Sequence, residues 1–480
     1  MRSPRRRLRS SREVLTAGFA AVRTEHQLPV EFSPEVLAEA ERAADGSGGA
    51  LTPGAVAAGR RDMRDVPFVT LDPVGSTDLD QAMHLARAGT GYRVTYAIAD
   101  TAAFVAPGGP LDTATRERAT TVYCPDTRVP LHPVALSEAA ASLLPGQERP
   151  AVVWSFGLEE DGAVRDVHVE RALVRSTAQL DYPTTQRRLD AGAGPDDVVT
   201  LLAEIGTRRA ALERARGGVS LARPEQEVVD APDGGWSLAF RASLPVEDHN
   251  AQVSLLTGMA AAELMVGAGV GILRTMPAAS PDAVATLRRQ ARALDVPWPA
   301  DQGYGDMLAG LDRGRPGAAA FLAAATGLFR GAAWTAFEGA PPADHVHGAI
   351  AAPYAHVTAP LRRLVDRFGL EICLAAQAGR PVPDWVRSAL PTLGSRMAAG
   401  AARAASVDRA CTDLVEAAVL APRVGQVFDG VALDERTVQL HEPAVIARLE
   451  EKGLPEGEPV RVRLLSADVA KRSVQFRVEH

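Results

Sequence analysis

The pattern of apolar and polar positions divides the chain into a strand-rich part, a helical part and a short strand-rich end. From about residue 64 the apolar residues come in short alternating runs, as in 68–71 and 92–100. The turn at 88–91 precedes the second run and predicts an antiparallel hairpin, and residues 151–174 repeat this pattern. Residues 64–180 are therefore predicted to be rich in sheet.

The middle of the chain, from about residue 185 to 420, has alanine- and leucine-rich segments separated by Pro and Gly clusters, which predict helices. The most apolar segment, Leu255–Leu273, contains Glu263, which favours a helix buried in the core over a membrane span. Sheet first and helices afterwards predict an α+β fold.

Short strands return from Gly425 onward. They are predicted at 427–433, 438–440, 460–465 and 474–478. This pattern suits a small OB-type barrel, provided that one more short strand lies among them.

The N-terminal residues predict a tail followed by two short helices. Residues 1–12 carry six arginines, a run typical of a solvated tail, although it could also steer an acidic polymer toward the protein. Ser11 can cap a helix with Leu15, Phe19 and Val22 on its apolar face, and Ser33-Pro34-Glu35 can start another. The glycine-rich stretch 45–49 reads as a linker.

Composition narrows the class of protein. The 480 residues are 46% hydrophobic and 23% charged with a formal charge of −7, which is typical of a globular protein and gives no global sign of nucleic-acid binding. The three cysteines are scattered, so neither a disulfide framework nor a zinc site is indicated. No export signal is visible, and we expect a cytoplasmic monomer that is not bound to a membrane.

Three aspartates, Asp72, Asp78 and Asp80, lie within nine residues beside a turn formed by Pro73 and Gly75. On an extended backbone Asp78 and Asp80 share a face, and the turn can return Asp72 to them. Carboxylate oxygens suit Mg²⁺, Mn²⁺ or Ca²⁺, although the spacing disfavours a calcium loop of the EF-hand type. Taken alone, the stretch is better explained by a solvent-exposed acidic turn.

A second candidate is the basic stretch near residue 360. Pro360 is placed to start a helix whose apolar stripe follows, which would put Arg362 and Arg363 in the first turn. The helix dipole disfavours cations there, so the pair suggests a phosphate clamp. Pairing of both arginines with surface acids is the alternative.

These stretches and the motifs between them occur in the order found in one enzyme family. The motifs are Thr70-Leu71-Asp72, Asp78-Leu79-Asp80, Ile98-Ala99-Asp100, Leu111-Asp112, Arg118-Ala119-Thr120-Thr121-Val122-Tyr123, Pro130-Leu131-His132-Pro133 and Thr358-Ala359-Pro360-Leu361-Arg362-Arg363. Over residues 64–375 the chain resembles the ribonuclease II/R (RNB) family.

The resemblance implies an RNB-type α+β catalytic domain at 63–420, after a basic tail and short helical region at 1–62 and before an OB-fold RNA-binding domain at 421–480. It implies a hydrolytic exoribonuclease that degrades single-stranded RNA from its 3′ end to nucleoside 5′-monophosphates, with Mg²⁺ or alternatively Mn²⁺ and no small-molecule cofactor.

The resemblance also implies roles for single residues. Asp72, Asp78 and Asp80 would hold metal, with Asp80 tied most directly to the chemistry. Arg362 would stabilise the charge that develops on the phosphate, and Tyr123 would stack on the terminal nucleotides. The predicted RNA-binding side chains of the catalytic and OB-fold domains are Tyr123, Arg362, Arg363, Phe428, Arg461, Arg463 and Lys471, with barrel core as the alternative for Phe428.

Several positions depart from the family pattern. Gln81 stands where the family has a fourth acid, and Ala359 stands where it has a serine. No second stacking aromatic is found near residues 223–226, and about 60 residues are too few for the paired cold-shock-type OB folds that usually precede this domain. Gln81 motivates the alternative of a catalytically weakened member that binds RNA or regulates. The motif Asp248-His249-Asn250 is interpreted as a helix cap.

Overall fold

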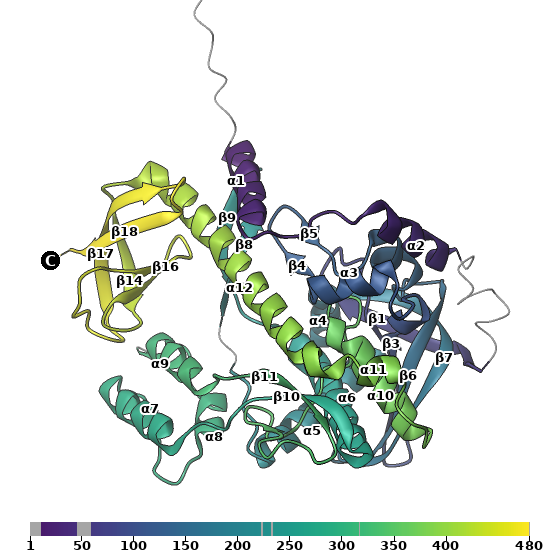
Figure 1. Ribbon diagram of the computed structural model, residues 1–480. Coiled ribbons are helices and arrows are strands. Elements are labelled where there is room, and N and C mark those ends of the chain that lie inside the picture. Colours follow the sequence, from purple (N-terminus) through teal and green to yellow (C-terminus); the bar gives the residue numbers. More distant parts are fainter. Residues whose placement is uncertain (1–10, 46–58, 222–223, 232–233, 316, 480) are drawn as a thin grey trace, which may run out of the picture.

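The structure of the protein is a computed structural model that describes residues 11–45, 59–221, 224–231, 234–315 and 317–479 (Figure 1). Most of the predicted basic tail and of the predicted linker at 45–49 lies outside the described residues.

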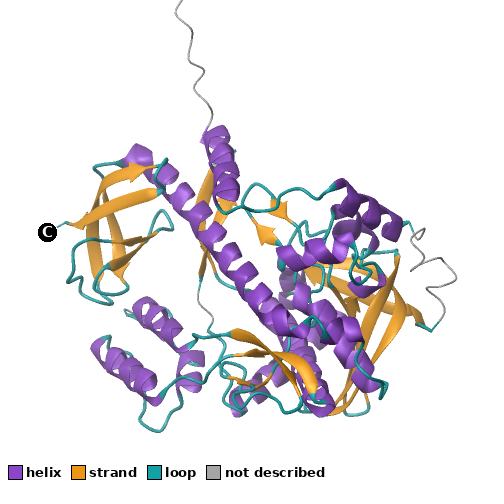
Figure 2. Ribbon diagram, in the orientation of Figure 1, coloured by secondary structure: helices purple, strands orange, loops and turns teal. Residues whose placement is uncertain are grey.

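Five strands close into a barrel in the order β1-β2-β3-β6-β7 (Figures 1 and 2). They are β1 (Arg61–Asp72), β2 (Gln81–Ala88), β3 (Gly91–Ala99), β6 (Glu148–Leu158) and β7 (Val164–Asp181). β1 runs parallel to β7, whereas the other neighbouring pairs are antiparallel. Both predicted hairpins, β2–β3 and β6–β7, are confirmed.

Helices cover the barrel and share its core. They are α3 (Pro110–Arg118), α4 (Tyr182–Asp190), α5 (Val198–Ala215), α6 (Pro245–Ala268), α10 (Leu364–Gln377), α11 (Asp384–Arg387) and α12 (Leu390–Leu420). Fully buried Trp154 and Phe156 of the barrel belong to the same apolar cluster as Val253 of α6 and Phe368 of α10. Burial of such large side chains is the main driving force that holds helices and sheet together.

Helix α6 corresponds to the segment predicted to be buried, but it is shorter at its C-terminal end than predicted. It stops at Ala268 because Gly269 takes a left-handed conformation with φ of 69°, and β10 (Val270–Thr275) follows. Of the described helices, α6 alone has the length and apolar composition to cross a membrane. Its contacts with α5, α10 and β10 make it a core helix.

Three helices form a separate apolar cluster at the edge of the molecule: α7 (Pro281–Ala293), α8 (Tyr304–Ala309) and α9 (Ala318–Ala325). In the described residues four short two-stranded sheets also occur: β4 (Val122–Tyr123) with β5 (Arg128–Val129), β8 (Glu225–Asp230) with β9 (Trp236–Arg241), β10 with β11 (Ala333–Glu338), and β12 (Val346–His347) with β13 (Ala352–Pro353). The last three interrupt the region predicted as mainly helical.

The C-terminal strands form one sheet in the order β16-β15-β14-β17-β18. They are β14 (Val427–Ala432), β15 (Thr437–Leu440), β16 (Ile446–Arg448), β17 (Pro459–Asp468) and β18 (Ser473–Val478). The four predicted strands are confirmed, and β16 is the fifth that the barrel required. Because β16 also contacts β18, the sheet is nearly closed.

The two predicted N-terminal helices are present as α1 (Ser11–Glu25) and α2 (Pro34–Ala44). In α1, Leu15, Phe19 and Val22 are buried in one cluster with the β8–β9 hairpin, the C-terminal half of α12 and the C-terminal sheet. The packing is close, because a Cβ added at Gly18 would come within 2.5 Å of Leu414 on α12. Figure 1 shows α12 running diagonally from the barrel side to this shared core.

Candidate active site

The three aspartates lie at one end of the five-stranded barrel. β1 ends at Asp72, β2 begins after Asp80, and these strands are antiparallel, so the loop between them stays at that end. Gly75 supplies the turn with φ of 80°. The predicted convergence is supported, since Asp72, Asp78 and Asp80 all interact electrostatically with one guanidinium, that of Arg362.

Asp80 is the most buried of the three, at 2% exposed. Its Oδ1 accepts a hydrogen bond from the backbone N–H of Leu361 at 2.7 Å, and its Oδ2 lies 3.2 Å from Nε of Arg362. Burial raises the pKa of Asp80 to about 7, although Arg362 and the Leu361 N–H oppose the rise. Because burial makes the ionised form of Asp80 costly, a further cation beside it would stabilise that form.

Asp72 is in a similar electrostatic position. Burial raises the pKa of Asp72 to about 6; Arg362 lowers it and Asp78 raises it further. Two tyrosines interact electrostatically with Asp72. Tyr96 shares a hydrogen bond of 2.9 Å with Ser254, and Tyr182 accepts one of 3.1 Å from the amide of Asn250.

Arg362 lies outside the helix in which the sequence places it. α10 begins at Leu364, and Arg363 is extended at φ −132° and ψ 124°, so the expectation that both arginines occupy a first helical turn is wrong. The segment is instead fixed by Asp366, whose Oδ2 accepts the backbone N–H of Ala359 at 2.7 Å. This leaves Arg362 half-exposed and directed at the carboxylates.

The neighbouring carboxylates stabilise the positive charge of Arg362. Burial by itself lowers the pKa of this guanidinium, but Asp80, Asp78 and Asp72 more than offset that effect and raise it. Arg362 therefore stays protonated in any aqueous buffer.

Arg363 does not join the carboxylate cluster. Its Nε and Nη2 bind the two oxygens of Asp366 at 3.0 and 2.8 Å. A guanidinium held by a buried partner in this way has a structural role, and the RNA contact of Arg363 stays a prediction.

Asp78 is held by the β4–β5 hairpin. Nη1 of Arg128 lies 3.0 Å from its Oδ1, and the hydroxyl of Tyr123 donates to its Oδ2 at 3.2 Å. Tyr123 is 50% exposed, so part of this side chain is accessible beside the cluster, which is compatible with its predicted stacking role.

Arg128, Tyr182 and Asn250 were not assigned to the site from the sequence. Arg128 is the cross-strand partner of Tyr123, and the four-residue turn Cys124-Pro125-Asp126-Thr127 between them was a usable hairpin signal. The interpretation of Asn250 as a cap is wrong, because α6 is capped at Leu244 and the amide of Asn250 binds Tyr182. Among the described residues, Oδ1 of Asn250 is a buried atom without a hydrogen-bond partner.

Gln81 directs its side chain to the protein backbone. Its Nε2 donates to the carbonyl of Thr358, in the segment that also carries Ala359 and Arg362. Gln81 thus ties the start of β2 to this segment without adding negative charge. Ala359 is 1% exposed, so the hydroxyl that the family places there is missing from a buried position.

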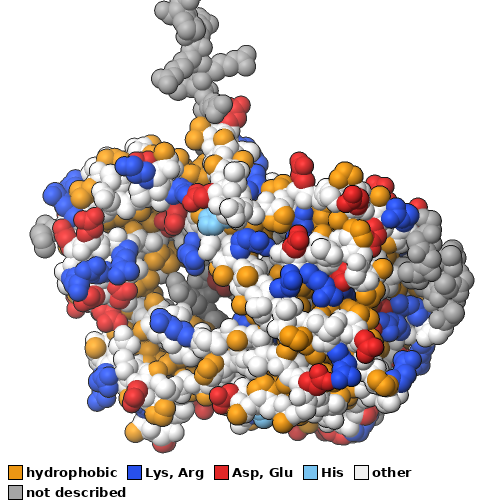
Figure 3. Space-filling view, in the orientation of Figure 1, with side chains coloured by type: hydrophobic (Ala, Val, Ile, Leu, Met, Phe, Trp, Pro, Cys, Tyr) orange, Lys and Arg blue, Asp and Glu red, His pale blue; other side chains and the backbone are white. Residues whose placement is uncertain are grey.

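The predicted RNA-binding residues of the C-terminal sheet differ in their surroundings. Phe428 is buried and meets Phe476 edge-on at 6.0 Å, so it belongs to the barrel core and not to an RNA-facing surface. Arg463 binds both oxygens of Glu479, whereas Lys471 and Arg461 are largely exposed. On the face seen in Figure 3, basic and acidic side chains are interspersed.

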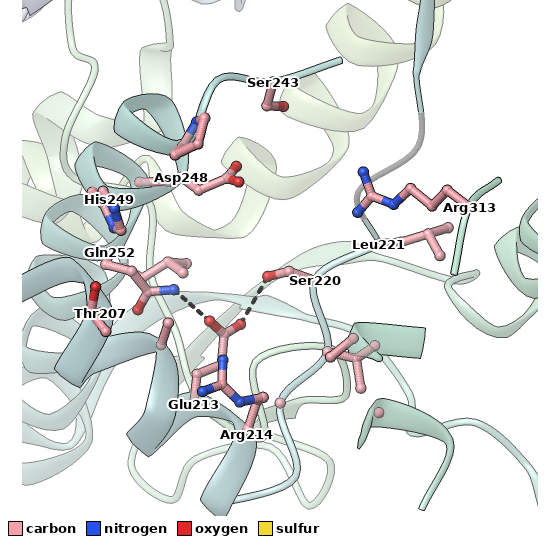
Figure 4. Close-up of a pocket in the computed structure, with 18 residues that line it drawn as sticks. Thr207, Glu213, Arg214, Ser220, Leu221, Ser243, Asp248, His249, Gln252 and Arg313 are labelled. Atoms are coloured by element: carbon pink, nitrogen blue, oxygen red, sulfur yellow. Dashed lines mark hydrogen bonds between the residues drawn. The ribbon is translucent and has the colours of Figure 1, made fainter. Parts of the chain in front are cut away.

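A separate pocket of about 590 Å³ is lined in part by residues of α6 (Figure 4). Its floor is Glu213, which accepts hydrogen bonds from Ser220 and Gln252, and Asp248 and Arg313 stand at its sides. Helical periodicity separates these positions from Asn250 and Ser254 on the same helix, so the pocket does not contain the aspartate cluster.

The donors fit a hard divalent cation by their chemistry, since they are carboxylates and burial makes the ionised forms of Asp72 and Asp80 costly. In this conformation, however, Asp78 and Asp80 are each paired with an arginine. Within the described ranges, no three His, Cys, Asp or Glu side chains lie together in a way that could hold a metal ion. The assignment of Asp72, Asp78 and Asp80 as metal ligands stays a prediction.

Comparison with known proteins decides the family. Residues 60–369, more than half of the chain, match the RNB domain family. The chain belongs to the RNB family. Residues 426–479 of this RNB protein match the RNase II-type exonuclease C-terminal S1 domain, in agreement with the nearly closed C-terminal sheet.

Curated relatives match parts of the RNB protein. Exoribonuclease 2 of Proteus mirabilis is 39% identical over 125 residues, which are 26% of this chain and 19% of the relative. Exosome complex exonuclease RRP44 homolog A of Arabidopsis thaliana is 27% identical over 338 residues, which are 67% of this chain and 36% of the relative. The matches therefore span well under half of these relatives.

Solved structures share the fold of the RNB protein. Mycoplasma genitalium RNase R in complex with ribose-methylated single-stranded RNA has a TM-score of 0.84 at 17% identity, over 97% of this chain and 78% of that one. Yeast Ssd1, described as a pseudonuclease, has a TM-score of 0.70 at 15% identity, over 87% of this chain and 54% of that one. The fold alone therefore does not separate a nuclease from an inactive relative.

Proposed function

We propose that this RNB-family protein is a hydrolytic 3′-to-5′ exoribonuclease that degrades single-stranded RNA to nucleoside 5′-monophosphates with the help of a divalent metal ion, Mg²⁺ or alternatively Mn²⁺. The observation that carries the proposal is the convergence of Asp72, Asp78 and Asp80 on Arg362 beside the half-exposed ring of Tyr123. Relatives named exoribonuclease 2 and ribonuclease R support it.

The three aspartates, Arg362 and Tyr123 have different roles under this proposal. Asp72, Asp78 and Asp80 would hold the metal, which when bound would activate water and neutralise the phosphate. Arg362 is charged and half-exposed, so it can pair with the phosphate and stabilise the charge that develops on it. Tyr123 offers a ring on which any base can stack, which suits a processive enzyme without sequence preference.

A second candidate function is an RNA-binding or regulatory protein with weakened catalysis. Gln81 motivates it, because an amide at the position of the fourth acid brings no charge to the metal and is engaged with the carbonyl of Thr358. Ssd1 illustrates that a pseudonuclease can carry this fold.

Cleavage of a labelled RNA separates the two candidates. Purified protein and its Asp80→Asn variant are incubated with 5′-labelled single-stranded RNA and Mg²⁺ or Mn²⁺. For the enzyme we expect processive shortening to a small limit product and release of nucleoside 5′-monophosphates, with both lost in Asp80→Asn. RNA binding without cleavage in either metal would instead establish the second candidate.

A further inference from the structure

Both carboxylate oxygens of Asp78 are already occupied in the free protein. Arg128 holds Oδ1 at 3.0 Å and the Tyr123 hydroxyl holds Oδ2 at 3.2 Å. The side chain of Asp78 is only 14% exposed, so solvent screens this pair weakly. A cation that binds Asp78 therefore competes with these two donors for the negative charge of one carboxylate.

Arg128 has a second anchor that keeps it in place. Its Nη2 lies 2.5 Å from Oε2 of Glu138 and donates to Oγ1 of Thr77 at 2.5 Å, and that hydroxyl donates to the same Glu138 oxygen at 2.8 Å. Arg128 can therefore release Asp78 while Glu138 still compensates its charge, so displacement does not leave a guanidinium without a counter-ion.

The same hairpin carries the ring on which RNA is proposed to stack. Tyr123 and Arg128 are direct cross-strand partners in β4–β5. Arg128 is 29% exposed, and its planar donor fork suits a phosphate as well as a carboxylate. An RNA end against Tyr123 thus brings phosphates within the neighbourhood of Arg128.

We propose that Arg128 is a positioning residue that competes with the divalent cation for Asp78 and releases this carboxylate when an RNA phosphate takes over its guanidinium. This inference rests on the proposed function, since it concerns the metal at the same site. It predicts that the cation and RNA each increase the affinity for the other.

The test measures Mn²⁺ binding by the full chain, with free Mn²⁺ quantified by electron paramagnetic resonance, in the wild type, Arg128→Gln and Arg128→Lys. We expect Arg128→Gln to bind Mn²⁺ about tenfold more tightly without RNA, because a charge-assisted hydrogen bond no longer opposes the cation. Arg128→Lys should stay close to the wild type. Arg93→Gln, which removes an arginine paired with surface Asp166, is the matched control and should change nothing.

Two further arms make the result specific. In an Asp78→Asn background, Arg128→Gln should no longer affect Mn²⁺ affinity. Ribose-methylated single-stranded RNA should tighten Mn²⁺ binding in the wild type but not in Arg128→Gln. Equal Mn²⁺ affinity of the wild type and Arg128→Gln, or an effect of Arg128→Gln that persists in the Asp78→Asn background, would overturn the inference even if RNA is cleaved. A protein that shows the predicted competition but never cleaves RNA would overturn the proposed function instead.

Discussion

Gln81 stands where the motif resemblance predicts a fourth acid. It follows Asp80 at the start of β2, and its amide bridges to the carbonyl of Thr358 on the segment that carries Arg362. The amide of Gln81 thus links the start of β2 to the segment that carries Arg362, and it brings no negative charge to a metal ion.

Replacing Gln81 by aspartate is expected to raise metal affinity and lower stability. The added carboxylate attracts the cation, so the Mg²⁺ concentration for half-maximal binding should fall by about tenfold. Loss of the donor to Thr358 should lower the free energy of unfolding by about 1 kcal/mol. Metal titration and denaturant unfolding measure the two effects.

Gln81→Asn is the matched control, because it shortens the side chain in the same way without adding charge. An unchanged Mg²⁺ titration in Gln81→Asp would show that this position does not contribute to the metal site.

The sequence predicted the members of the site better than their partners. Asp72, Asp78 and Asp80 are predictable because acid spacing along an extended chain is local information. Arg128 reaches Asp78 through a tertiary contact that spacing does not encode. Arg363 is withdrawn by Asp366, which lies only three residues later in the chain.

The β4–β5 hairpin is the element that sets the geometry around Asp78. Its strands are two residues each, too short to hold position by themselves, and its tip is fastened to α1 by Arg23, which binds Asp126 through two contacts of 2.6 and 3.1 Å. Helix α1 therefore acts on the site through this ion pair.

Arg23→Gln is expected to destabilise the protein and loosen the hairpin. Both partners are nearly buried, at 12% and 11% exposed, so removing one leaves Asp126 without its counter-ion, at a cost of about 3 kcal/mol. Thermal or urea unfolding measures the loss, and faster amide exchange at 122–129 would report the loosened hairpin.

Arg61→Gln is the control for this change, because the Arg61 side chain is 61% exposed in its pair with Glu170, and it should cost under about 1 kcal/mol. Equal stability losses in the two variants would show that the tip contact does not anchor the hairpin.

Among the secondary-structure elements, the apolar pattern predicted those with a clear local periodicity and missed three strand pairs in the middle of the chain. The hairpins of the barrel, α1, α2 and the C-terminal strands follow from local periodicity. The strand pairs β8–β9, β10–β11 and β12–β13 contact helices that lie far away in sequence, namely α12 or α6. The start of α10 is set by the contact of Asp366 with Ala359.

Beside the apolar core that they share, β8, α12 and the S1 domain are also linked by a polar contact. Gln226 of β8 donates to Glu416 of α12 and to the carbonyl of Ala444 in the S1 domain, both at 2.7 Å. Burial raises the pKa of Glu416 to about 7, with Gln226 opposing the rise. Glu416 therefore keeps its proton in the folded state to a higher pH than in the unfolded chain.

This contact predicts a pH-dependent stability. Between pH 4.5 and about 7 the folded protein holds a proton that the unfolded chain has lost, so stability should fall as pH rises through this window. Glu416→Gln cannot ionise and should be more stable than the wild type at pH 8 by about 3 kcal/mol, with little difference at pH 4.5. Thermal unfolding at the two pH values measures this.

Glu35→Gln, at an exposed position of α2, is the control and should leave the pH profile unchanged. If Glu416→Gln showed the same dependence of stability on pH as the wild type, other groups would be responsible for that dependence.

The core shared by α1, the β8–β9 hairpin, α12 and the S1 domain has a consequence for how the chain is made. The apolar face of α1 leaves the ribosome hundreds of residues before the α12 and S1 side chains that cover it. Until synthesis reaches that point the face has only the β8–β9 hairpin as a native partner, and closing so long a loop is slow. Nascent chains should therefore leave part of α1 accessible to chaperones until α12 and the S1 domain have been made, and closure of this shared core should be a late step of folding.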